Sequence, residues 1–302
     1  MTVLLVTNFE PAEVTAWQAA LAAALTGETI VFDPGPDVDV ALVANPPPGR
    51  LRGLPNLKLI QSLWAGIDSV LADPDLPDAP LCRMVDPAMA ETMAEAALAH
   101  VLWLHRHQDD YARAQREGVW RQHAYLSPQA RRVGVLGLGV MGQTVARRLE
   151  GAGFQVAAWV SRARENAVAG SDALPGFLGG CDIVINLLAL TPATIGLLDA
   201  RAFAAMPAGA ALINLARGRH VVEDDLRAAL DSGRLRHAVL DVMRDEPPPP
   251  GHWVWPHPRV TLTPHVAAPS DPASGAAVVA DNILRLRQGR PLLHTVERGR
   301  GY

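Results

Sequence analysis

The sequence of 302 residues contains only two cysteines, Cys82 and Cys181, which lie far apart and lack the spacing of metal ligands. We expect both to be buried as small apolar residues rather than joined in a disulfide, a pattern typical of a reducing compartment. The histidines, aspartates and glutamates likewise show no metal-site spacing, so no metal ion is predicted.

Basic runs and long apolar segments are also missing. The formal net charge is −4, and without a cluster of Lys and Arg a nucleic-acid-binding surface is not expected. No apolar run approaches the ~20 residues of a membrane helix, and residues 1–6 indicate a first strand rather than a signal peptide. The sequence therefore predicts a cytoplasmic protein that binds neither nucleic acid nor membrane.

Apolar residues are abundant, at 49% of the chain, against 19% charged residues. This composition and length indicate a globular protein large enough for two domains. Residues 1–85 alternate strand-like and helix-like segments, and residues 132–265 form a second such series, which predicts parallel sheets covered by helices. Two further segments are predicted to be helical, one long helix at 87–116 and another at 273–287.

A glycine motif lies at the start of the second series. Gly137, Gly139 and Gly142 follow the apolar segment 133–136 and precede an amphipathic helical segment at 143–149. The first glycine permits a tight turn, the second lets the backbone approach a pyrophosphate, and the third allows close contact of helix and strand. The unpaired N–H groups at the helix start favour phosphate. This arrangement predicts a dinucleotide site of the Rossmann type.

Three chemically related side chains follow later strand-like segments. Arg217, Glu246 and His265 each come shortly after an apolar run, at 211–213, 238–242 and 260–262 respectively. Open α/β sheets bind ligands at the carboxyl ends of their strands. An arginine binds a carboxylate through two parallel hydrogen bonds, a histidine exchanges a proton near neutral pH, and a neighbouring acid stabilises its charged form. We therefore expect these three residues to form one site.

With these motifs the chain resembles the D-isomer-specific 2-hydroxyacid dehydrogenases. The resemblance is carried by the glycine motif, by Asn-Leu-Ala-Arg-Gly at 214–218, by Asp241 and Glu246, and by Thr-Pro-His at 263–265. Within that family the chain looks most like the shorter bacterial glyoxylate/hydroxypyruvate reductases, on the strength of residues 61–68, 264–268 and 298–302.

The resemblance implies an α/β fold of two Rossmann-like or flavodoxin-like domains with parallel sheets. An NAD(P)-binding Rossmann domain at 99–268 is expected to be inserted into a discontinuous, flavodoxin-like substrate domain formed by 1–98 and 269–302. The family also implies a homodimer. The Ala- and Met-rich segment 88–101 could supply its contact face, or could instead be buried between the domains.

In the family, residues in these frames reduce a 2-keto acid. His265 would donate the proton in reduction, Glu246 would hold the imidazolium, and Arg217 would bind the substrate carboxylate and polarise the carbonyl. Trp64, Ala65 and Gly66 would bind the substrate together with Arg217 and His265, which also contact the cofactor. The other expected cofactor-binding residues are Gly137, Gly139, Val140, Met141, Gly142, Ser161, Arg162, Arg164, Leu188, Thr191, Leu215, Ala216, Asp241 and Ala267.

The sequence departs from the family pattern at the substrate end. Trp64 stands where a small residue is usual, and it either reshapes the pocket or takes part in a subunit contact. Ala44-Asn45-Pro46 lacks a tryptophan, and Ser270-Asp271 lacks a basic residue, that close relatives carry. Glyoxylate and hydroxypyruvate are the substrates implied. A reductase of bulkier 2-keto acids such as phenylpyruvate, and a dinucleotide-sensing binding protein without catalysis, are the alternatives.

The choice of cofactor follows from the residues themselves. A site that prefers NAD places Asp or Glu about 20 residues past the glycines to bind the adenine ribose. Here that window, 157–162, contains no acid, and Arg162 and Arg164 occupy its end and the following loop. Without a carboxylate to repel a 2′-phosphate, and with guanidinium groups to bind it, NADP(H) is predicted over NAD(H), which remains possible.

Overall fold

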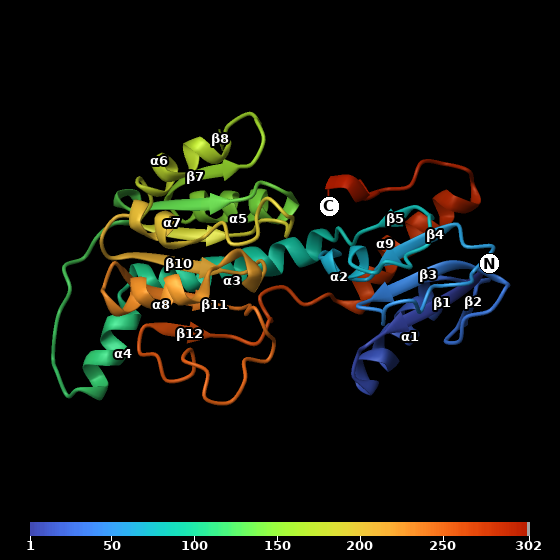
Figure 1. The fold of residues 1–302 in the computed structure, drawn as a ribbon, viewed down its shortest axis with the longest axis horizontal. Helices are drawn as coiled ribbons and strands as arrows, with labels where there is room; N and C mark the ends of the chain where they lie inside the picture. The colour runs from blue at the N-terminus through green and yellow to red at the C-terminus, as the bar shows by residue number, and fades with distance from the viewer. Residues whose placement is uncertain (301–302) are drawn as a thin grey trace. The chain divides into compact units, whose positions relative to one another are not determined.

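The computed structural model describes residues 1–300 and divides into two compact units. Unit 1 contains residues 1–89 and the segment that begins at Ser270, and unit 2 contains residues 90–269. Each unit has a sheet whose strands are all parallel, covered by helices, so the predicted α/β fold class is confirmed (Figure 1). The boundaries differ from the predicted ones, 98/99 and 268/269, and the first lies nine residues earlier.

Unit 1 contains a five-stranded sheet in the order β2-β1-β3-β4-β5 within the described residues. Its strands are β1 (Thr2–Thr7), β2 (Thr29–Val31), β3 (Val38–Ala44), β4 (Leu59–Ser62) and β5 (Leu81–Cys82). Its helices are α1 (Pro11–Ala24), α2 (Asp68–Leu71) and α9 (Pro272–Arg287), and α3 begins at its end. A Cβ on Gly275 would lie 2.5 Å from the Trp17 ring, so glycine is what lets α9 pack closely on α1.

Unit 2 contains a seven-stranded sheet in the order β12-β11-β10-β9-β6-β7-β8 within the described residues. Its strands are β6 (Arg132–Leu136), β7 (Gln155–Val160), β8 (Val168–Ala169), β9 (Ile183–Asn186), β10 (Ala210–Asn214), β11 (Leu235–Leu240) and β12 (Val260–Leu262). Its helices are α3 (Pro87–His105), α4 (Gln108–Arg116), α5 (Val140–Gly151), α6 (Leu174–Leu178), α7 (Ala200–Ala205) and α8 (Glu223–Asp231). The strand order reverses between β6 and β9, which is where open sheets of this kind bind ligands.

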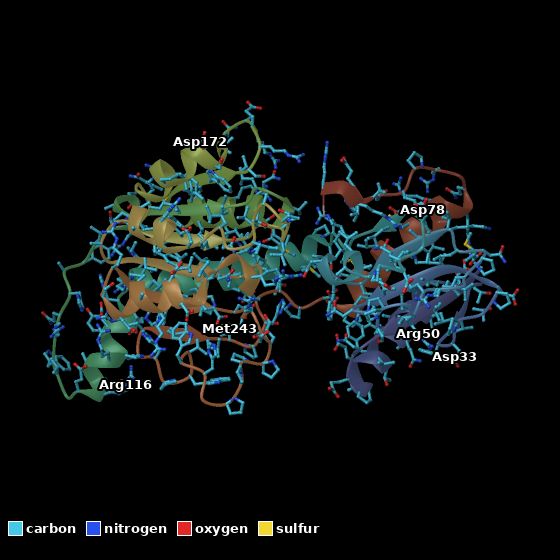
Figure 2. All side chains as sticks on the ribbon, viewed as in Figure 1. Asp33, Arg50, Asp78, Arg116, Asp172 and Met243 are labelled. Carbon is cyan, nitrogen blue, oxygen red and sulfur yellow. The ribbon has the colours of Figure 1, made fainter. Side chains whose placement is uncertain are left out.

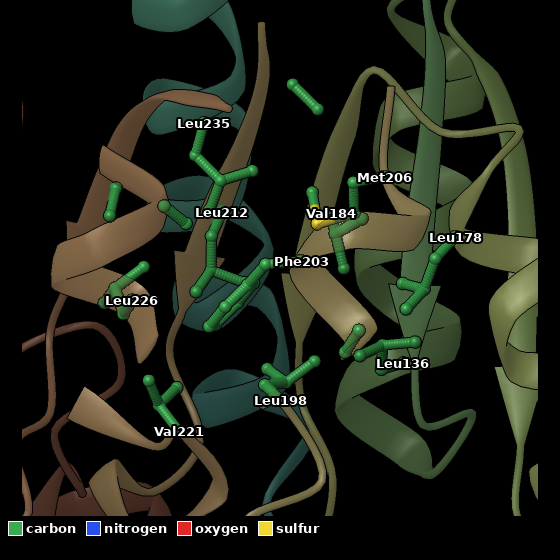
Figure 3. Close-up of a cluster of buried hydrophobic side chains, with 14 of the residues drawn as sticks. Leu136, Leu178, Val184, Leu198, Phe203, Met206, Leu212, Val221, Leu226 and Leu235 are labelled. Carbon is green, nitrogen blue, oxygen red and sulfur yellow. The ribbon is translucent and has the colours of Figure 1, made fainter. Parts of the chain in front are cut away.

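Helices cover both faces of the second sheet. On one face, β-strand residues pack with α6, α7 and α8, for example Leu212 with Phe203 (Figure 3). On the other face, strand residues such as Val135 pack with α3 and α5 through Ala97 and Val145. Because the central strands are buried on both faces, they show continuous apolar runs in the sequence. The Ala- and Met-rich segment 88–101 contributes to this core, so burial within the chain accounts for its composition.

The prediction of one long helix at 87–116 is wrong. α3 ends at His105, and α4 begins at Gln108 after His107, whose φ of 56° is left-handed. Arg236 of β11 donates a hydrogen bond to the Leu104 carbonyl at 2.6 Å and also binds Asp109. This arginine satisfies a carbonyl at the end of α3 and pairs with the start of α4, so a residue from a distant strand stabilises the break.

Cys82 and Cys181 are both free and buried, as predicted. Burial raises the pKa of the Cys181 thiol to about 11, so this cysteine is a packing residue rather than a nucleophile. Among residues 1–300, no helix has the length and apolar character needed to cross a membrane.

Candidate functional site

The predicted site residues of unit 2 gather at one edge of its sheet. Because all paired strands run parallel, the loops after β6, β9, β10, β11 and β12 leave the sheet at the same edge. These loops carry the glycine motif at 137–142, residues 187–191, residues 215–218, residues 241–246 and residues 263–267. The fold therefore brings together segments that are separated by more than 100 residues of sequence.

The glycine loop has the shape that the motif predicts. Gly137 adopts a left-handed φ of 97°. A Cβ on Gly142 would lie 1.9 Å from the Gly137 carbonyl oxygen, which no side chain could tolerate. A Cβ on Gly139 would meet nothing within 4 Å, and Gly139 caps α5 without a side-chain hydrogen bond. The loop thus leaves open space before a helix N-terminus with unpaired N–H groups, and this fits the pyrophosphate of a dinucleotide.

A groove of about 380 Å³ is lined by α5, by residues 156–158 of β7 and by the segment 164–166, and it reaches the glycine loop at Leu138. Its lining includes Leu138, Arg164 and Glu165, and the Arg164 guanidinium donates a hydrogen bond to the Leu138 carbonyl. Ser161 and Arg162 are exposed where β7 ends, and Arg162 does not line the groove. The structure therefore brings Arg164 against the glycine loop, and a carboxylate that the sequence reasoning did not consider accompanies it.

Arg217 follows β10 and is half-buried, with its guanidinium donating to the Ala216 carbonyl at 2.7 Å. The next residue explains the local packing. A Cβ on Gly218 would lie 1.9 Å from the Met243 carbonyl carbon, so glycine is required for the loop after β10 to lie against the loop after β11. Met243 is labelled in Figure 2. This close approach brings the segment that carries Arg217 next to the segment that carries Glu246.

Glu246 and His265 are joined by a hydrogen bond in which Glu246 Oε2 lies 2.8 Å from His265 Nδ1. The other carboxylate oxygen accepts a hydrogen bond from the Met243 N–H at 2.9 Å, which fixes the orientation of the acid. Burial acts to raise the pKa of Glu246, but the hydrogen bonds from His265 and Met243, with the charge of Arg217, hold it below its usual value. The acid is therefore ionised at neutral pH and leaves Nε2 of the histidine available for proton exchange.

Asp241 holds the turn that presents His265. Its carboxylate is buried and accepts hydrogen bonds from Thr263 Oγ1 at 2.6 Å and from the N–H groups of Val266 and Ala267 at 2.9 Å. His265 itself has a left-handed φ of 55°, and its N–H donates to the Asp241 carbonyl at 2.8 Å. The expected role of Asp241 in binding the cofactor remains a prediction, and in the structure its carboxylate holds this turn.

A buried network that the sequence reasoning missed joins two loops of the site. The Asn186 side-chain amide donates to Asn214 Oδ1 and lies 2.9 Å from His220 Nδ1. His220 Nε2 lies 3.3 Å from the Ala189 carbonyl oxygen, which assigns its proton to Nε2. A signal was present, because Asn186 and Asn214 both end apolar strands, and they are paired in register.

The other expected cofactor-binding residues of unit 2 occupy the same loops. Val140 is exposed and Met141 half-buried at the start of α5, and Leu188 and Thr191 are half-buried after β9. The remaining three are buried, and they are Leu215, Ala216 and Ala267.

The expected substrate loop belongs to unit 1. Trp64, Ala65 and Gly66 are half-buried after β4. The Trp64 ring lies 5.8 Å from the ring of Phe9, and its backbone N–H and carbonyl both bond to Ser62 Oγ. Trp64 is therefore packed within unit 1. Of the C-terminal segment 298–302, which contributed to the family resemblance, residues 301–302 lie outside the described residues.

Comparisons with known proteins agree with this geometry. Residues 98–267 match the family model of the D-isomer specific 2-hydroxyacid dehydrogenase, NAD binding domain. A D-isomer specific 2-hydroxyacid dehydrogenase from Xanthobacter autotrophicus, solved with NADPH and MES, is 39% identical, with a TM-score of 0.94 over 100% of this chain and 99% of that one.

Two further solved structures are similar over the same extent. An NADPH-dependent glyoxylate/hydroxypyruvate reductase from Sinorhizobium meliloti, solved with NADP and sulfate, is 35% identical, with a TM-score of 0.92 over 100% of this chain and 99% of that one. A probable 2-hydroxyacid dehydrogenase from Rhizobium etli, solved with NADP, HEPES and L(+)-tartaric acid, is 30% identical, with a TM-score of 0.90 and the same coverage.

Proposed function

Since this chain belongs to the D-isomer specific 2-hydroxyacid dehydrogenase family and is an NAD(P)-dependent oxidoreductase, we propose that it reduces small 2-keto acids with NADPH. Glyoxylate and hydroxypyruvate are the first substrates to test, because they are named for the reductase from Sinorhizobium meliloti. The observation that carries the proposal is the Glu246–His265 pair at 2.8 Å, with Arg217 in the neighbouring loop and the glycine motif at the same sheet edge.

In this proposal His265 is the proton donor. When bound, the nicotinamide supplies the hydride that adds to the keto carbon. The carbonyl oxygen gains an electron pair and takes the proton from Nε2 of His265, which becomes neutral. Glu246 stabilises the imidazolium before transfer and keeps the ring oriented through Nδ1. In oxidation the same nitrogen accepts the proton.

Arg217 is proposed to hold the other end of the substrate. A guanidinium binds a carboxylate through two parallel hydrogen bonds and stabilises charge that develops on the adjacent carbonyl oxygen. Trp64, Ala65 and Gly66 of unit 1 are proposed to bind the substrate as well. In this assignment unit 1 is the substrate domain and unit 2 the nucleotide domain.

The preference for NADPH is proposed to depend on Arg164, with Arg162 as the second candidate. The support is that Arg164 lines the groove beside the glycine loop, and that no acid stands at the end of β7. Glu165, which lines the same groove, would repel a 2′-phosphate and limit the preference.

Steady-state kinetics with both cofactors test this assignment. Arg164→Ala should lower kcat/KM for NADPH by about tenfold or more, since a hydrogen bond to a charged group contributes about 1.5–3 kcal/mol, and should leave NADH little changed. Arg162→Ala is measured in the same way. Glu165→Gln changes the charge in the opposite direction, by removing a carboxylate of nearly the same shape, and should favour NADPH. Equal kcat/KM values for the two cofactors in the unmutated enzyme, or equal losses for both in each arginine variant, would contradict the proposal.

The alternatives remain distinguishable by substrate. A non-catalytic nucleotide sensor has no need of the Glu246–His265 pair, so this geometry favours catalysis. A screen of glyoxylate, hydroxypyruvate and phenylpyruvate with NADPH distinguishes a reductase of small keto acids, a reductase of bulkier keto acids and a sensor without catalysis. Turnover of phenylpyruvate far above that of glyoxylate would favour the reductase of bulkier keto acids, and no turnover of any keto acid would favour the sensor.

We further propose a homodimer that works in the reducing cytoplasm. The free, buried cysteines of the described chain suit that compartment. Val119, Trp120 and Tyr125 are exposed in the loop after α4, and Trp120 has 94% of its surface exposed. Exposed aromatic groups of this kind are common at subunit contacts. Light scattering that gives the mass of a single 32.2 kDa chain at micromolar concentrations would refute the dimer.

A further inference from the structure

Three potential metal ligands lie together at the edge of unit 2 opposite the candidate site. His107 occupies the break between α3 and α4, Asp110 lies in the first turn of α4, and His123 belongs to the loop at 117–127 that runs from α4 toward β6 (Figure 1). Arg236 lies near Asp110, at 3.9 Å, and is the second residue of β11, which identifies this as the edge where the strands begin. Arg116, labelled in Figure 2, ends α4.

The ligand atoms have a spacing that suits a small transition-metal ion. Asp110 Oδ2 lies 3.4 Å from His107 Nδ1 and 3.9 Å from His123 Nε2, and the three atoms lie within 4.8 Å of one another. Zinc binds His nitrogen and carboxylate oxygen at about 2.0–2.2 Å in a tetrahedron, so its ligand atoms lie about 3.3 Å apart. The three side chains are 18–25% exposed, so solvent can reach the cluster.

Neighbouring groups hold Asp110 and the backbone of His123 in place. Arg113 binds Asp110 Oδ1 and leaves Oδ2 toward the histidines. The Tyr111 hydroxyl accepts a hydrogen bond from the His123 N–H at 3.1 Å, which fixes the loop beside α4. Outer contacts of this sort are what fix the ligands in metal sites.

Charge sets the strength of binding that the cluster can provide. Asp109 and Asp110 are balanced by Arg113 and Arg236. A divalent ion would therefore add net positive charge, so we expect binding that is reversible and weaker than at a structural zinc site.

We propose that His107, Asp110 and His123 bind one Zn²⁺ ion per chain, which fastens the loop 117–127 to α4. The fourth ligand is water. The two imidazole rings are stacked at 4.4 Å with 5° between their planes, so their ring nitrogens do not converge on one point until at least one ring rotates. Zinc binding would therefore separate the stacked rings and bring a nitrogen of each to the same ion. This rearrangement should change the NMR chemical shifts of the two imidazole rings.

Calorimetric titration of the full chain, without an affinity tag and freed of metal by a chelator, tests the proposal with ZnCl₂. We expect one equivalent of Zn²⁺ to bind at pH 7.5 and binding to weaken below pH ~6, where histidines become protonated. His123→Gln removes one ligand from an open loop, and His107→Asn removes another while keeping a residue that tolerates the left-handed backbone. Each should weaken Zn²⁺ binding by at least about tenfold.

The matched control is His257→Gln. His257 also pairs with a carboxylate, Asp231, at 3.1 Å, but lies outside the cluster. The His257→Gln variant should bind Zn²⁺ as tightly as the unmutated chain does. The assignment is wrong if the unmutated chain does not bind zinc. It is also wrong if His123→Gln binds zinc as tightly as His257→Gln does.

Discussion

Replacing Glu246 by glutamine tests how much the acid contributes to proton transfer. In the structure one carboxylate oxygen accepts from the Met243 N–H and the other pairs with His265 Nδ1. Glutamine has a single acceptor oxygen, so one of these two contacts must be lost. If Oε1 stays with Met243, the amide N–H groups face the protonated Nδ1 of the histidine, and donor opposes donor.

The magnitude follows from Coulomb's law and the exposure of the pair. Unit charges 4 Å apart interact by about 1 kcal/mol in water and about 4 kcal/mol at an effective dielectric of 20. Because the side chains of His265 and Glu246 are 49% and 39% exposed, solvent screening favours the lower end. We expect Glu246→Gln to cost about 1–2 kcal/mol, which lowers kcat/KM about 5–30-fold.

The pH dependence carries a second signature of the same pair. In oxidation, where His265 accepts the proton, the acidic limb of the kcat/KM profile should move to lower pH in Glu246→Gln, because the imidazolium has lost its partner. For stability, the pKa of Glu246 is depressed in the folded chain. Its contribution is therefore present above the unfolded value of about 4.3 and is lost as pH falls through the folded value.

Steady-state kinetics across pH, with thermal unfolding of both proteins, measure these effects. The stability difference between the unmutated protein and Glu246→Gln should shrink as the pH is lowered through the acid range. A variant with kcat/KM within twofold of the unmutated enzyme, and with an unchanged pH profile, would show that the acid does not assist the histidine.

Two further predictions concern the loops that hold the site. Asp241→Asn leaves one acceptor oxygen for three donors, so it should lower stability by about 1.5–3 kcal/mol and loosen the turn of His265; an unchanged melting temperature and kcat would contradict this reading. Gly142→Ala should weaken NADPH binding strongly, since its Cβ would lie 1.9 Å from the Gly137 oxygen. Gly151→Ala, in the same helix but with open space around its Cβ, is the control in a fluorescence titration, and equal affinities of the two variants would refute the argument.

Much of the fold was predictable from the sequence because its central strands are buried on both faces. Such strands give continuous apolar runs, and the segments at 133–136 and 211–213 coincide with β6 and β10. The glycine spacing was equally informative, since Gly142 meets a backbone atom that no other residue could accommodate. The grouping of Arg217, Glu246 and His265 was predictable for a related reason, because each of these residues follows a recognisable strand.

The features that the sequence could not reveal depend on contacts between distant segments. The break at His107 involves Arg236, which is remote in sequence and binds the ends of both helices. The position of Arg164 in the groove depends on the path of a loop that has no periodic pattern. The cluster of His107, Asp110 and His123 has no regular spacing, because a turn and a long loop bring its members together.

The most direct test of the central claim is the consumption of NADPH, followed by its nicotinamide absorbance, by the unmutated protein and by His265→Ala with glyoxylate and hydroxypyruvate. Loss of a positioned proton donor removes about 10²–10⁴-fold in rate. We predict clear turnover by the unmutated protein and a fall of that size in His265→Ala. The variant should still unfold cooperatively, with only the small loss of stability that comes from removing the contact with Glu246, because the His265 side chain is half exposed. Near-native turnover by His265→Ala would contradict the assignment of His265 as the proton donor.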